Sequence, residues 1–361
     1  MKNVCIVLRN QKNGILNPDF SAVADAFLSG GYFLDEVRLL PYDRVGELHA
    51  ALRGFLADAD FVCVCADKVL TEGVRHNLEQ TFSLRFAGEG SLVRAERAYL
   101  CVLPAGEEGK ELVTEKVVPA LNEAFAVRYD RMILRMVGAP REKVASAINE
   151  AYAVSGDKLD YNYTENFADG RLEVIYDAET PKMLADNVMR VLLSALEEYV
   201  YALDDTPLAE RVFEGLSLRK CRLSTAESFT GGRVSAAVVR VPGVSSVFYE
   251  GLNTYSNESK AARLSVKEDT LRRYGAVSAQ TAHEMAEGLF ATGGCDVCVA
   301  TTGIAGPRSD SSKKPVGLCY IAAGINGQIF VNEYVFKGDR ECITQTAVNY
   351  ALFAVFRLLK Q

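Results

Sequence analysis

The sequence predicts an α/β protein of two or three domains, and three observations support this fold class. The chain has 361 residues, which is long enough for several hydrophobic cores. In the first half, strand-like runs of Val, Leu, Ile and Phe alternate with helix-like stretches, as in a three-layer α/β domain. Beyond residue 205, a buried strand opens into a glycine-containing loop, as strands of parallel α/β sheets do where they bind ligands.

Residues 1–137 are expected to form one α/β domain. Apolar periodicity places strands at 3–8, 33–40, 60–65 and 97–103 and helices near 20–29, 44–57, 70–81 and 108–125. Cys63 and Cys65 lie inside one of these strands, and we expect them to be small buried hydrophobes. The nine cysteines indicate no disulfide framework and the three histidines are scattered, so the sequence predicts no metal site.

Residues 138–205 are expected to form a small α+β connector. Its predicted elements are a helix near 141–152, a half-buried strand at 171–176 and a longer helix from about residue 181. Tyr161 and Tyr163 are expected in an exposed turn, although they could line a nucleotide. The Asp204-Asp205-Thr206-Pro207 segment is the predicted hinge into the last domain.

Residues 206–361 are expected to form a compact α/β/α domain. Helices are predicted at 207–216, 231–241, 267–273, 278–291 and 339–359, and strands at 221–226, 248–255, 295–302, 315–324 and 328–337.

Ser228 stands at the turn between a predicted strand and a predicted helix. Gly231 and Gly232 permit a tight turn there, and the unpaired amides at the start of a helix suit an oxyanion or a phosphate. Ser228 could instead be only the N-cap of the helix, because serine is among the commonest caps.

Tyr255 and Lys260 follow in a second polar segment. Taken singly, a half-buried tyrosine and a solvated lysine are the simpler interpretations. A third segment, residues 301–307, opens into a glycine-containing loop directly after the apolar run 297–300. Together, the three segments can supply a nucleophile, backbone donors and a base without histidine or metal.

Six motifs occur in order along this last domain. They are Ala226-Glu227-Ser228-x-Thr230-Gly231-Gly232, Tyr255-Ser256-Asn257-x-x-Lys260, Gly275-Ala276-Val277-Ser278, Thr302-Gly303-Ile304-Ala305-Gly306-Pro307, Lys314-Pro315-Val316-Gly317 and Gly338-Asp339-Arg340. The series resembles the C-terminal domain of the CinA family of competence/damage-inducible proteins over about residues 206–361. The resemblance implies a nicotinamide-nucleotide amidase, which hydrolyses the carboxamide of nicotinamide mononucleotide to nicotinic acid mononucleotide and ammonia.

The resemblance also implies roles for single residues. Ser228 would be the nucleophile, Lys260 the general base, and Tyr255 an aid to proton transfer. The remaining residues would bind substrate: the amides of Thr230, Gly231 and Gly232 would hold the oxyanion, and Thr302, Gly303 and Arg340 would help to hold the nucleotide. For Arg340, an exposed residue at the start of a helix is an equally good interpretation. No cofactor is implied.

This chain departs from the family pattern at three places near the site. Phe229 stands where a cysteine is usual, and its bulk is expected to narrow the pocket. Residues 308–312 replace a loop richer in glycine, and Thr344 stands where a second arginine is common. The last two departures could weaken or retune nucleotide binding.

By position and pattern, residues 1–137 resemble the family's N-terminal domain, which is akin to molybdopterin-binding proteins and in some members hydrolyses ADP-ribose with a divalent metal. The glycine-rich loop expected after the strand ending at Cys65 is replaced by residues 66–73, which lack its glycines and paired carboxylates. The sequence therefore predicts a degenerate domain that has lost the hydrolase and serves dimerisation or interdomain packing.

Composition limits the partners. The net charge of −7 repels polyanions, so we predict no nucleic-acid partner. No apolar run is expected to span a membrane, and the N-terminus lacks a signal-peptide layout, so we predict a cytoplasmic protein. The resemblance implies a homodimer or higher homo-oligomer. Two alternatives stay open: a catalytically silent pyridine-nucleotide sensor or scaffold, and an amidase for another carboxamide.

Overall fold

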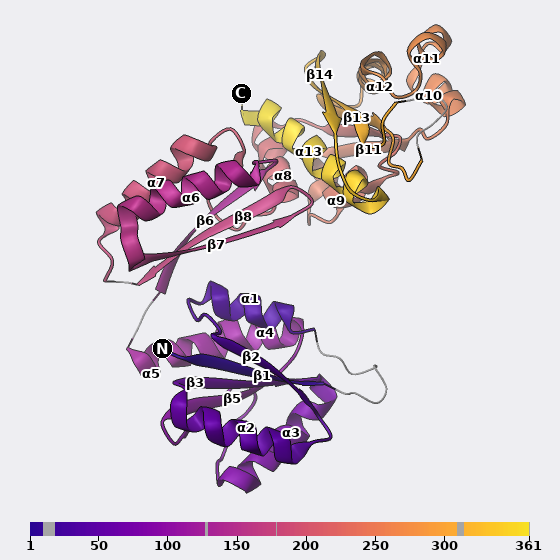
Figure 1. The fold of residues 1–361 in the computed structure, drawn as a ribbon. Helices are drawn as coiled ribbons and strands as arrows, with labels where there is room; N and C mark the ends of the chain where they lie inside the picture. The colour runs from indigo at the N-terminus through magenta and orange to yellow at the C-terminus, as the bar shows by residue number, and fades with distance from the viewer. Residues whose placement is uncertain (10–18, 127–128, 178, 309–313, 361) are drawn as a thin grey trace. The chain divides into compact units, whose positions relative to one another are not determined.

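The structure is a computed structural model that describes residues 1–9, 19–126, 129–177, 179–308 and 314–360. The chain divides into two compact units. The first contains Met1–Arg131 with Asp157–Asp160 and Ile175–Lys182, and the second contains the rest. The strand β6 (Tyr129–Val137) pairs within the sheet of the connector (Figure 1). We propose the three-domain division 1–137, 138–205 and 206–361, in which β6 is the strand of the first range that pairs in the sheet of the second.

The first unit holds a five-stranded sheet in the order β2-β1-β3-β5-β4. The parallel strands are β1 (Asn3–Arg9), β2 (Glu36–Pro41), β3 (Phe61–Ala66) and β5 (Ala98–Pro104), and β4 (Val93–Ala95) runs antiparallel to β5. Helices α2 (Val45–Asp58) and α3 (Lys68–Phe82) cover one face. The other face is covered by α1 (Ser21–Ser29), α4 (Glu107–Leu112), the π-helical turn η1 (Val113–Val117) and α5 (Val118–Phe125). This unit is the three-layer α/β arrangement that the sequence predicts.

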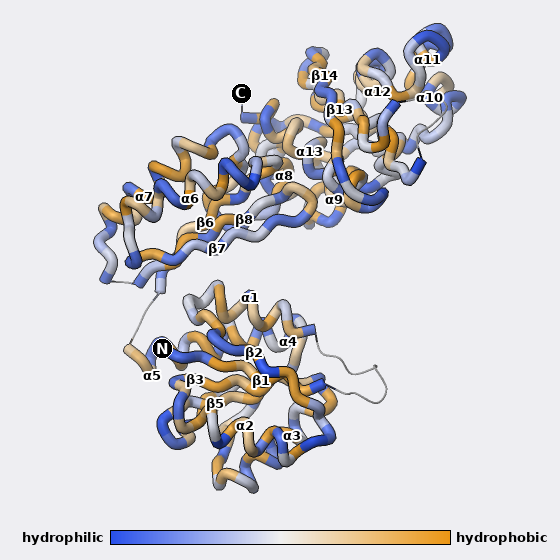
Figure 2. Tube along the Cα trace, viewed as in Figure 1, coloured by the Kyte–Doolittle hydropathy of each residue, from blue (hydrophilic) through white to orange (hydrophobic). Residues whose placement is uncertain are grey.

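The core of this unit follows from the hydrophobic strands. In Figure 2 the strands β1, β3 and β5 are coloured as hydrophobic, in contrast to the polar stretches around them. Cys63 and Cys65 are fully buried beside Cys5 and Cys101. Burial raises the pKa of the Cys101 thiol well above its usual range, which keeps the thiol neutral. The prediction that the strand cysteines are small buried hydrophobes is confirmed.

The connector contains a four-stranded sheet in the order β7-β8-β6-β9, formed by β7 (Leu159–Asn166), β8 (Asp169–Asp177), β6 and β9 (Val200–Ala202). Helices α6 (Arg141–Ser155) and α7 (Lys182–Leu196) accompany it. The expected exposed turn at Tyr161 and Tyr163 was wrong, because both residues are half-buried in β7. The Tyr161 hydroxyl lies 2.8 Å from Ser155 Oγ, and Tyr163 donates to Glu165 at 3.0 Å.

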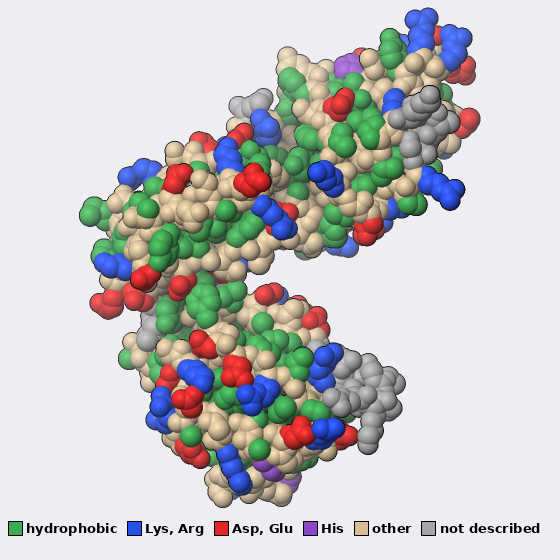
Figure 3. All heavy atoms as spheres, viewed as in Figure 1, with side chains coloured by type: hydrophobic (Ala, Val, Ile, Leu, Met, Phe, Trp, Pro, Cys, Tyr) green, Lys and Arg blue, Asp and Glu red, His purple; other side chains and the backbone are tan. Residues whose placement is uncertain are grey.

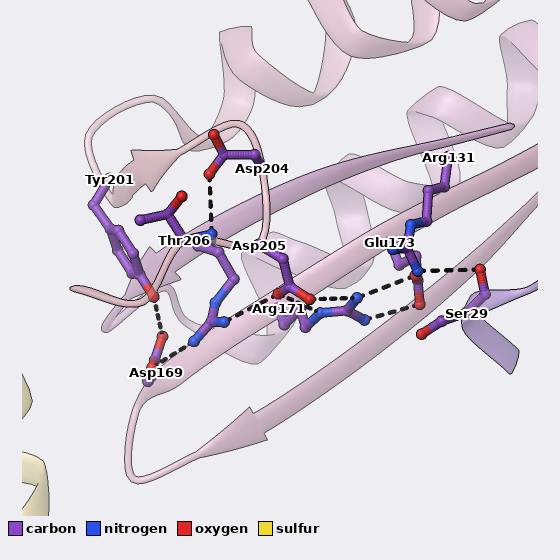
Figure 4. Close-up of polar contacts among 10 residues, drawn as sticks. Ser29, Arg131, Asp169, Arg171, Glu173, Tyr201, Asp204, Asp205 and Thr206 are labelled. Atoms are coloured by element: carbon purple, nitrogen blue, oxygen red, sulfur yellow. Dashed lines mark hydrogen bonds and ion pairs between the residues drawn. The ribbon is translucent and has the colours of Figure 1, made fainter. Parts of the chain in front are cut away.

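Ion pairs hold the predicted hinge in place (Figure 4). The Asp205 carboxylate accepts from Arg135 Nη1 at 3.2 Å and from Arg171 Nε at 2.9 Å. Arg171 also donates to Glu173, which is fully buried in β8. The Asp204 side chain accepts from the amide of Thr206 at 3.0 Å. The segment that enters the last domain is therefore fastened to β6 and β8.

The last domain holds a second five-stranded sheet, in the order β11-β10-β12-β13-β14. Strands β11 (Phe248–Asn253), β10 (Leu223–Glu227) and β12 (Val297–Gly303) are parallel, whereas β13 (Leu318–Ile325) and β14 (Gln328–Val335) are antiparallel additions. Helices α8 (Leu208–Arg219), α9 (Arg233–Val239) and α13 (Arg340–Lys360) pack on one face. The other face is covered by helices α10 (Asn257–Leu264), α11 (Glu268–Tyr274) and α12 (Ala279–Ala291), which form a separate hydrophobic core with it. The predicted α/β/α architecture is confirmed.

Helix α13 is the one helix in the described ranges that is long and apolar enough to cross a membrane. By length and composition alone, α13 contradicts the expectation that no apolar segment is long enough to span a membrane. However, 61% of its most apolar window is buried inside the protein, where the helix packs against α8 and β13. These properties are those of a core helix.

On the face of the molecule drawn in Figure 3, acidic and basic side chains are interspersed.

Candidate active site

Ser228 lies directly after β10, at the carboxyl end of a central parallel strand. Its amide donates to the carbonyl of Thr301 at 3.0 Å, and the side chain is almost completely buried. Gly231 and Gly232 adopt φ angles of 61° and 92°, which glycine tolerates without strain. The N-cap of α9 is Gly232, so the alternative that Ser228 caps this helix was wrong.

Lys260 reaches Ser228 from helix α10, which the sequence reasoning missed. The lysine is 1% exposed, so the interpretation of a solvated side chain was wrong. Its Nζ lies 2.9 Å from Ser228 Oγ, 2.8 Å from the carbonyl oxygen of Thr254 and 3.2 Å from that of Tyr255. Ser256 begins the helix by accepting a hydrogen bond from the amide of Ser259.

The three partners of Lys260 fit both protonation states of its amine, since an ammonium can donate to all three oxygens and a neutral amine to two of them. Burial lowers the pKa of Lys260 from 10.5 to about 8, and Glu258 opposes this shift. A neutral amine has two N–H groups and one lone pair. The carbonyls of Thr254 and Tyr255 can accept only N–H groups, so the lone pair is left for the hydroxyl of Ser228. In this state the Ser228 hydroxyl donates to Lys260, as removal of its proton requires.

The side chain of Glu227 binds the turn after Ser228 and the start of α9, a role that the sequence reasoning did not identify. It is 1% exposed and accepts from the Thr230 hydroxyl at 2.8 Å and from the amides of Gly232, Val234 and Ser235 at 3.0, 3.0 and 2.8 Å. Its position at the end of a strand, just before a helix whose N-terminus attracts negative charge, was the available signal.

The backbone amides of residues 229–232 differ in whether they already have a hydrogen-bond partner inside the protein. The Gly232 amide donates to Glu227, and the Gly231 amide donates to the carbonyl of Ser228 at 3.1 Å. Among the described residues, no hydrogen bond is recorded for the amides of Phe229 and Thr230. These two amides are therefore the ones in the turn without a hydrogen-bond partner in the described chain.

Tyr255 and Arg340 meet at the edge of the site. The Tyr255 side chain is 63% exposed, and its hydroxyl accepts from Arg340 Nη2 at 3.3 Å. Arg340 Nη1 donates to the carbonyl of Gly306 at 2.9 Å. The structure thus brings Tyr255 to Arg340, and within the described chain no hydrogen bond joins its hydroxyl to Ser228 or Lys260.

Thr302 and Gly303 end β12 beside the site. The Thr302 side chain is fully buried and donates to the carbonyl of Ala276 at 2.7 Å, so its hydroxyl is already used inside the protein. A Cβ atom on Gly303 would lie 2.6 Å from Cys319 Cβ, which explains why a glycine is needed next to β13. Both residues position the loop that carries Gly306.

Phe229 is buried in a cluster with Ala305, Cys319, Ile343 and Ala347. Its bulk is thus packed into the core beside the turn, and a narrowing of the pocket stays a prediction. Thr344 is also buried, and its hydroxyl donates back to the carbonyl of Arg340 at 2.8 Å. Of the altered loop, residues 309–312 lie outside the described residues. In the described ranges, no group of three or more His, Cys, Asp or Glu side chains is arranged to hold a metal ion.

Comparisons with known proteins agree with the motifs. Residues 205–359 match the family profile of the CinA C-terminal domain. A competence-damage inducible protein of Clostridium botulinum (strain ATCC 19397 / Type A) is 32% identical over 307 residues, which cover 82% of this chain and 75% of that protein. One of Clostridium acetobutylicum is 43% identical over 171 residues, which cover 47% of this chain and 42% of that protein.

Among solved structures, a CinA superfamily protein from Klebsiella pneumoniae 700603 is 35% identical with a TM-score of 0.42, and the match covers 42% of this chain and 96% of that one. The match to the Clostridium botulinum protein extends beyond the C-terminal domain and covers most of both chains. The chain therefore belongs to the CinA family of competence/damage-inducible proteins.

Proposed function

We propose that this protein is a nicotinamide-nucleotide amidase that converts nicotinamide mononucleotide and water to nicotinic acid mononucleotide and ammonia. The observation that carries the proposal is the buried amine of Lys260, 2.9 Å from Ser228 Oγ. A serine whose hydroxyl contacts a buried amine is one arrangement that can cleave an amide without histidine.

In the proposed mechanism, Lys260 takes the proton of Ser228 as Oγ attacks the carboxamide carbon. The amides of Phe229 and Thr230 hold the negative oxygen of the tetrahedral intermediate. The Lys260 ammonium then protonates the leaving nitrogen, and ammonia departs from an acyl-serine. Lys260 next takes a proton from a water molecule, whose oxygen attacks the ester carbon. The Lys260 ammonium then returns this proton to Ser228 Oγ as the C–O bond to the serine breaks, which releases the acid product and restores Ser228 and the neutral amine.

Arg340 is proposed to bind the phosphate of the nucleotide, since its planar fork suits phosphate oxygens and it is exposed. Tyr255, which touches Arg340, would aid proton transfer once the nucleotide is bound. Gly231, Gly232, Thr302 and Gly303 would shape the site through the backbone.

The first domain is proposed to be a degenerate molybdopterin-binding-like domain without hydrolase activity. After β3 ends at Ala66, Asp67 at once caps α3 by accepting from the amide of Val69 at 3.0 Å. No long loop remains there to surround a pyrophosphate. We also propose a cytoplasmic homodimer or higher homo-oligomer that acts on a small pyridine nucleotide, without nucleic-acid or membrane partners.

The test is ammonia release from nicotinamide mononucleotide by the purified protein beside Ser228→Ala. We expect the substitution to reduce turnover at least about 10³-fold, because it removes the nucleophile. A chelator should leave the wild-type rate unchanged, since no step of this mechanism uses a metal. Equal rates for both proteins would refute the mechanism. Tight nucleotide binding without ammonia release would favour the sensor.

The pH dependence should follow Lys260. Because burial lowers the pKa of Lys260 to about 8, the neutral base is the minor form below pH 8 and the major form above it. We expect kcat/KM to rise about fifty-fold between about pH 6 and pH 8 and then to level off. Initial ammonia-release rates across this range would measure the profile, and a rate that falls as the pH rises would contradict the role of Lys260.

A further inference from the structure

The carboxylate of Glu227 lies at the start of α9 and accepts hydrogen bonds from the amides of Gly232, Val234 and Ser235. Both of its oxygens are used, since Ser235 donates to Oε1 through its amide and hydroxyl at 2.8 and 2.7 Å, while Thr230, Gly232 and Val234 donate to Oε2. A buried carboxylate with five donors is fully satisfied and needs no external partner.

Glu227 also contacts the residues that hold Ser228 and Lys260, the candidate catalytic pair. Because Thr230 donates to Glu227, the Thr301 hydroxyl must donate to Thr230, 2.7 Å away. The carbonyl of Thr301 in turn accepts a hydrogen bond from the amide of Ser228. The carbonyl of Glu227 accepts from the amide of Thr254 at 2.8 Å, and the carbonyl of Thr254 holds Lys260. Glu227 therefore contacts the supports of both Ser228 and Lys260.

We infer that Glu227 is a positioning residue: its carboxylate fixes the 228–232 turn so that Ser228 Oγ stays on the Lys260 amine, and it closes the N-terminus of α9 to the phosphate of the substrate. The anion of the substrate is consequently bound away from this helix end. This inference rests on the proposed function, because positioning matters only if Ser228 and Lys260 react.

The experiment compares Glu227→Gln with wild type and with Ser224→Ala. Gln keeps the size of the side chain but replaces one acceptor oxygen with an NH₂ group that faces N–H donors. Ser224 lies in the same strand and is fully buried, and its side chain faces Cys295 and makes none of the contacts of the 228–232 turn, so it is a matched control. We expect Glu227→Gln to lower kcat about 100-fold, as misplacement of a nucleophile by about 1 Å does, and Ser224→Ala to have little effect.

Two further readouts separate positioning from a general loss of folded protein. The midpoint of the pH profile should move in Glu227→Gln, because both the solvation of Lys260 and the charge near it change, whereas a smaller folded fraction lowers only the height of the profile. Hydrogen exchange of the Val234 and Ser235 amides should accelerate in Glu227→Gln and not in Ser224→Ala.

The outcomes distinguish this inference from the proposed function. If wild type releases no ammonia, the proposed function fails, and accelerated exchange would still show that Glu227 anchors the turn. If wild type is active and Glu227→Gln matches it in rate and pH midpoint, the positioning role is overturned. Should Glu227→Gln not fold, Ser235→Ala removes one donor only. Because Ser235→Ala keeps the carboxylate, we then expect a several-fold lower kcat and an upward shift of the midpoint as Lys260 becomes more solvated, and an unchanged profile would overturn the inference.

Discussion

Replacing Lys260 with Met should reduce ammonia release about 10³- to 10⁴-fold, because the only amine on Ser228 Oγ in the described site is removed. Met keeps the length and apolar stem of the side chain, so the buried space remains filled. Steady-state kinetics with nicotinamide mononucleotide would measure the loss. Lys267→Met is the matched control, since the Lys267 side chain is 74% exposed, and its rate should equal that of wild type.

The loss of activity in Lys260→Met should not come from unfolding. Lowering the pKa of Lys260 from 10.5 to about 8 corresponds to a cost of about 3 kcal/mol for the buried ammonium at neutral pH. Met removes this cost but also removes three hydrogen bonds, worth about 1 kcal/mol each, so the net change is small.

The pH dependence of stability has a definite sign. Between about pH 8 and 10.5 the unfolded chain binds the Lys260 proton and the folded chain does not, so wild type gains stability over Lys260→Met as the pH rises through this window. Denaturant unfolding at several pH values would measure the difference. A constant difference, or an active Lys260→Met, would contradict the burial of a titrating amine.

Replacing Gly288 with Ala should destabilise the last domain by about 2–3 kcal/mol and lower its Tm by about 5–10 °C. A Cβ atom at Gly288 would lie 2.3 Å from the carbonyl oxygen of Leu264 and 2.7 Å from its Cα. These are backbone atoms at the end of α10, so they cannot swing aside as a flexible side chain does. Helix α10 must shift away from α12, and Lys260, which lies one turn before Leu264, must shift with it. Thermal unfolding and ammonia release should both report the change.

Gly54→Ala is the matched control for this substitution. Gly54 lies inside helix α2, and no neighbouring atom lies within 4 Å of an added Cβ. Alanine is the better helix former, so this change should raise the stability of the first unit by up to about 1 kcal/mol and leave ammonia release unchanged. If Gly288→Ala were as harmless as Gly54→Ala, the close contact between α10 and α12 would be wrong.

The regular part of the fold could be predicted from periodicity. Most helices and strands of the described chain lie within a few residues of their expected bounds, because their apolar residues repeat at the spacing of a buried face. Helix α10 was missed because most of its residues are polar or charged, and its helical start depends on the cap at Ser256. Strand β7 was missed because its alternation is carried by half-buried tyrosines between acidic and polar residues.

The candidate site could be predicted as a set of residues but not as an arrangement. The motifs identified Ser228 and Lys260, and the structure brings them together. Helix α10, which carries Lys260, packs closely against α12 at Gly288, which lies far away in sequence. For the same reason the sequence offered the amides of Gly231 and Gly232 as oxyanion donors, although both are engaged inside the protein.

The ion pairs around Asp205 attach the start of the last domain to the small sheet. Arg135 in β6 and Arg171 in β8 both donate to Asp205, only three residues before α8 begins at Leu208. Two guanidinium groups from different strands thus bind one carboxylate, so the residues that lead into α8 are held at two points, and a change of angle between the small sheet and α8 must break at least one of these ion pairs.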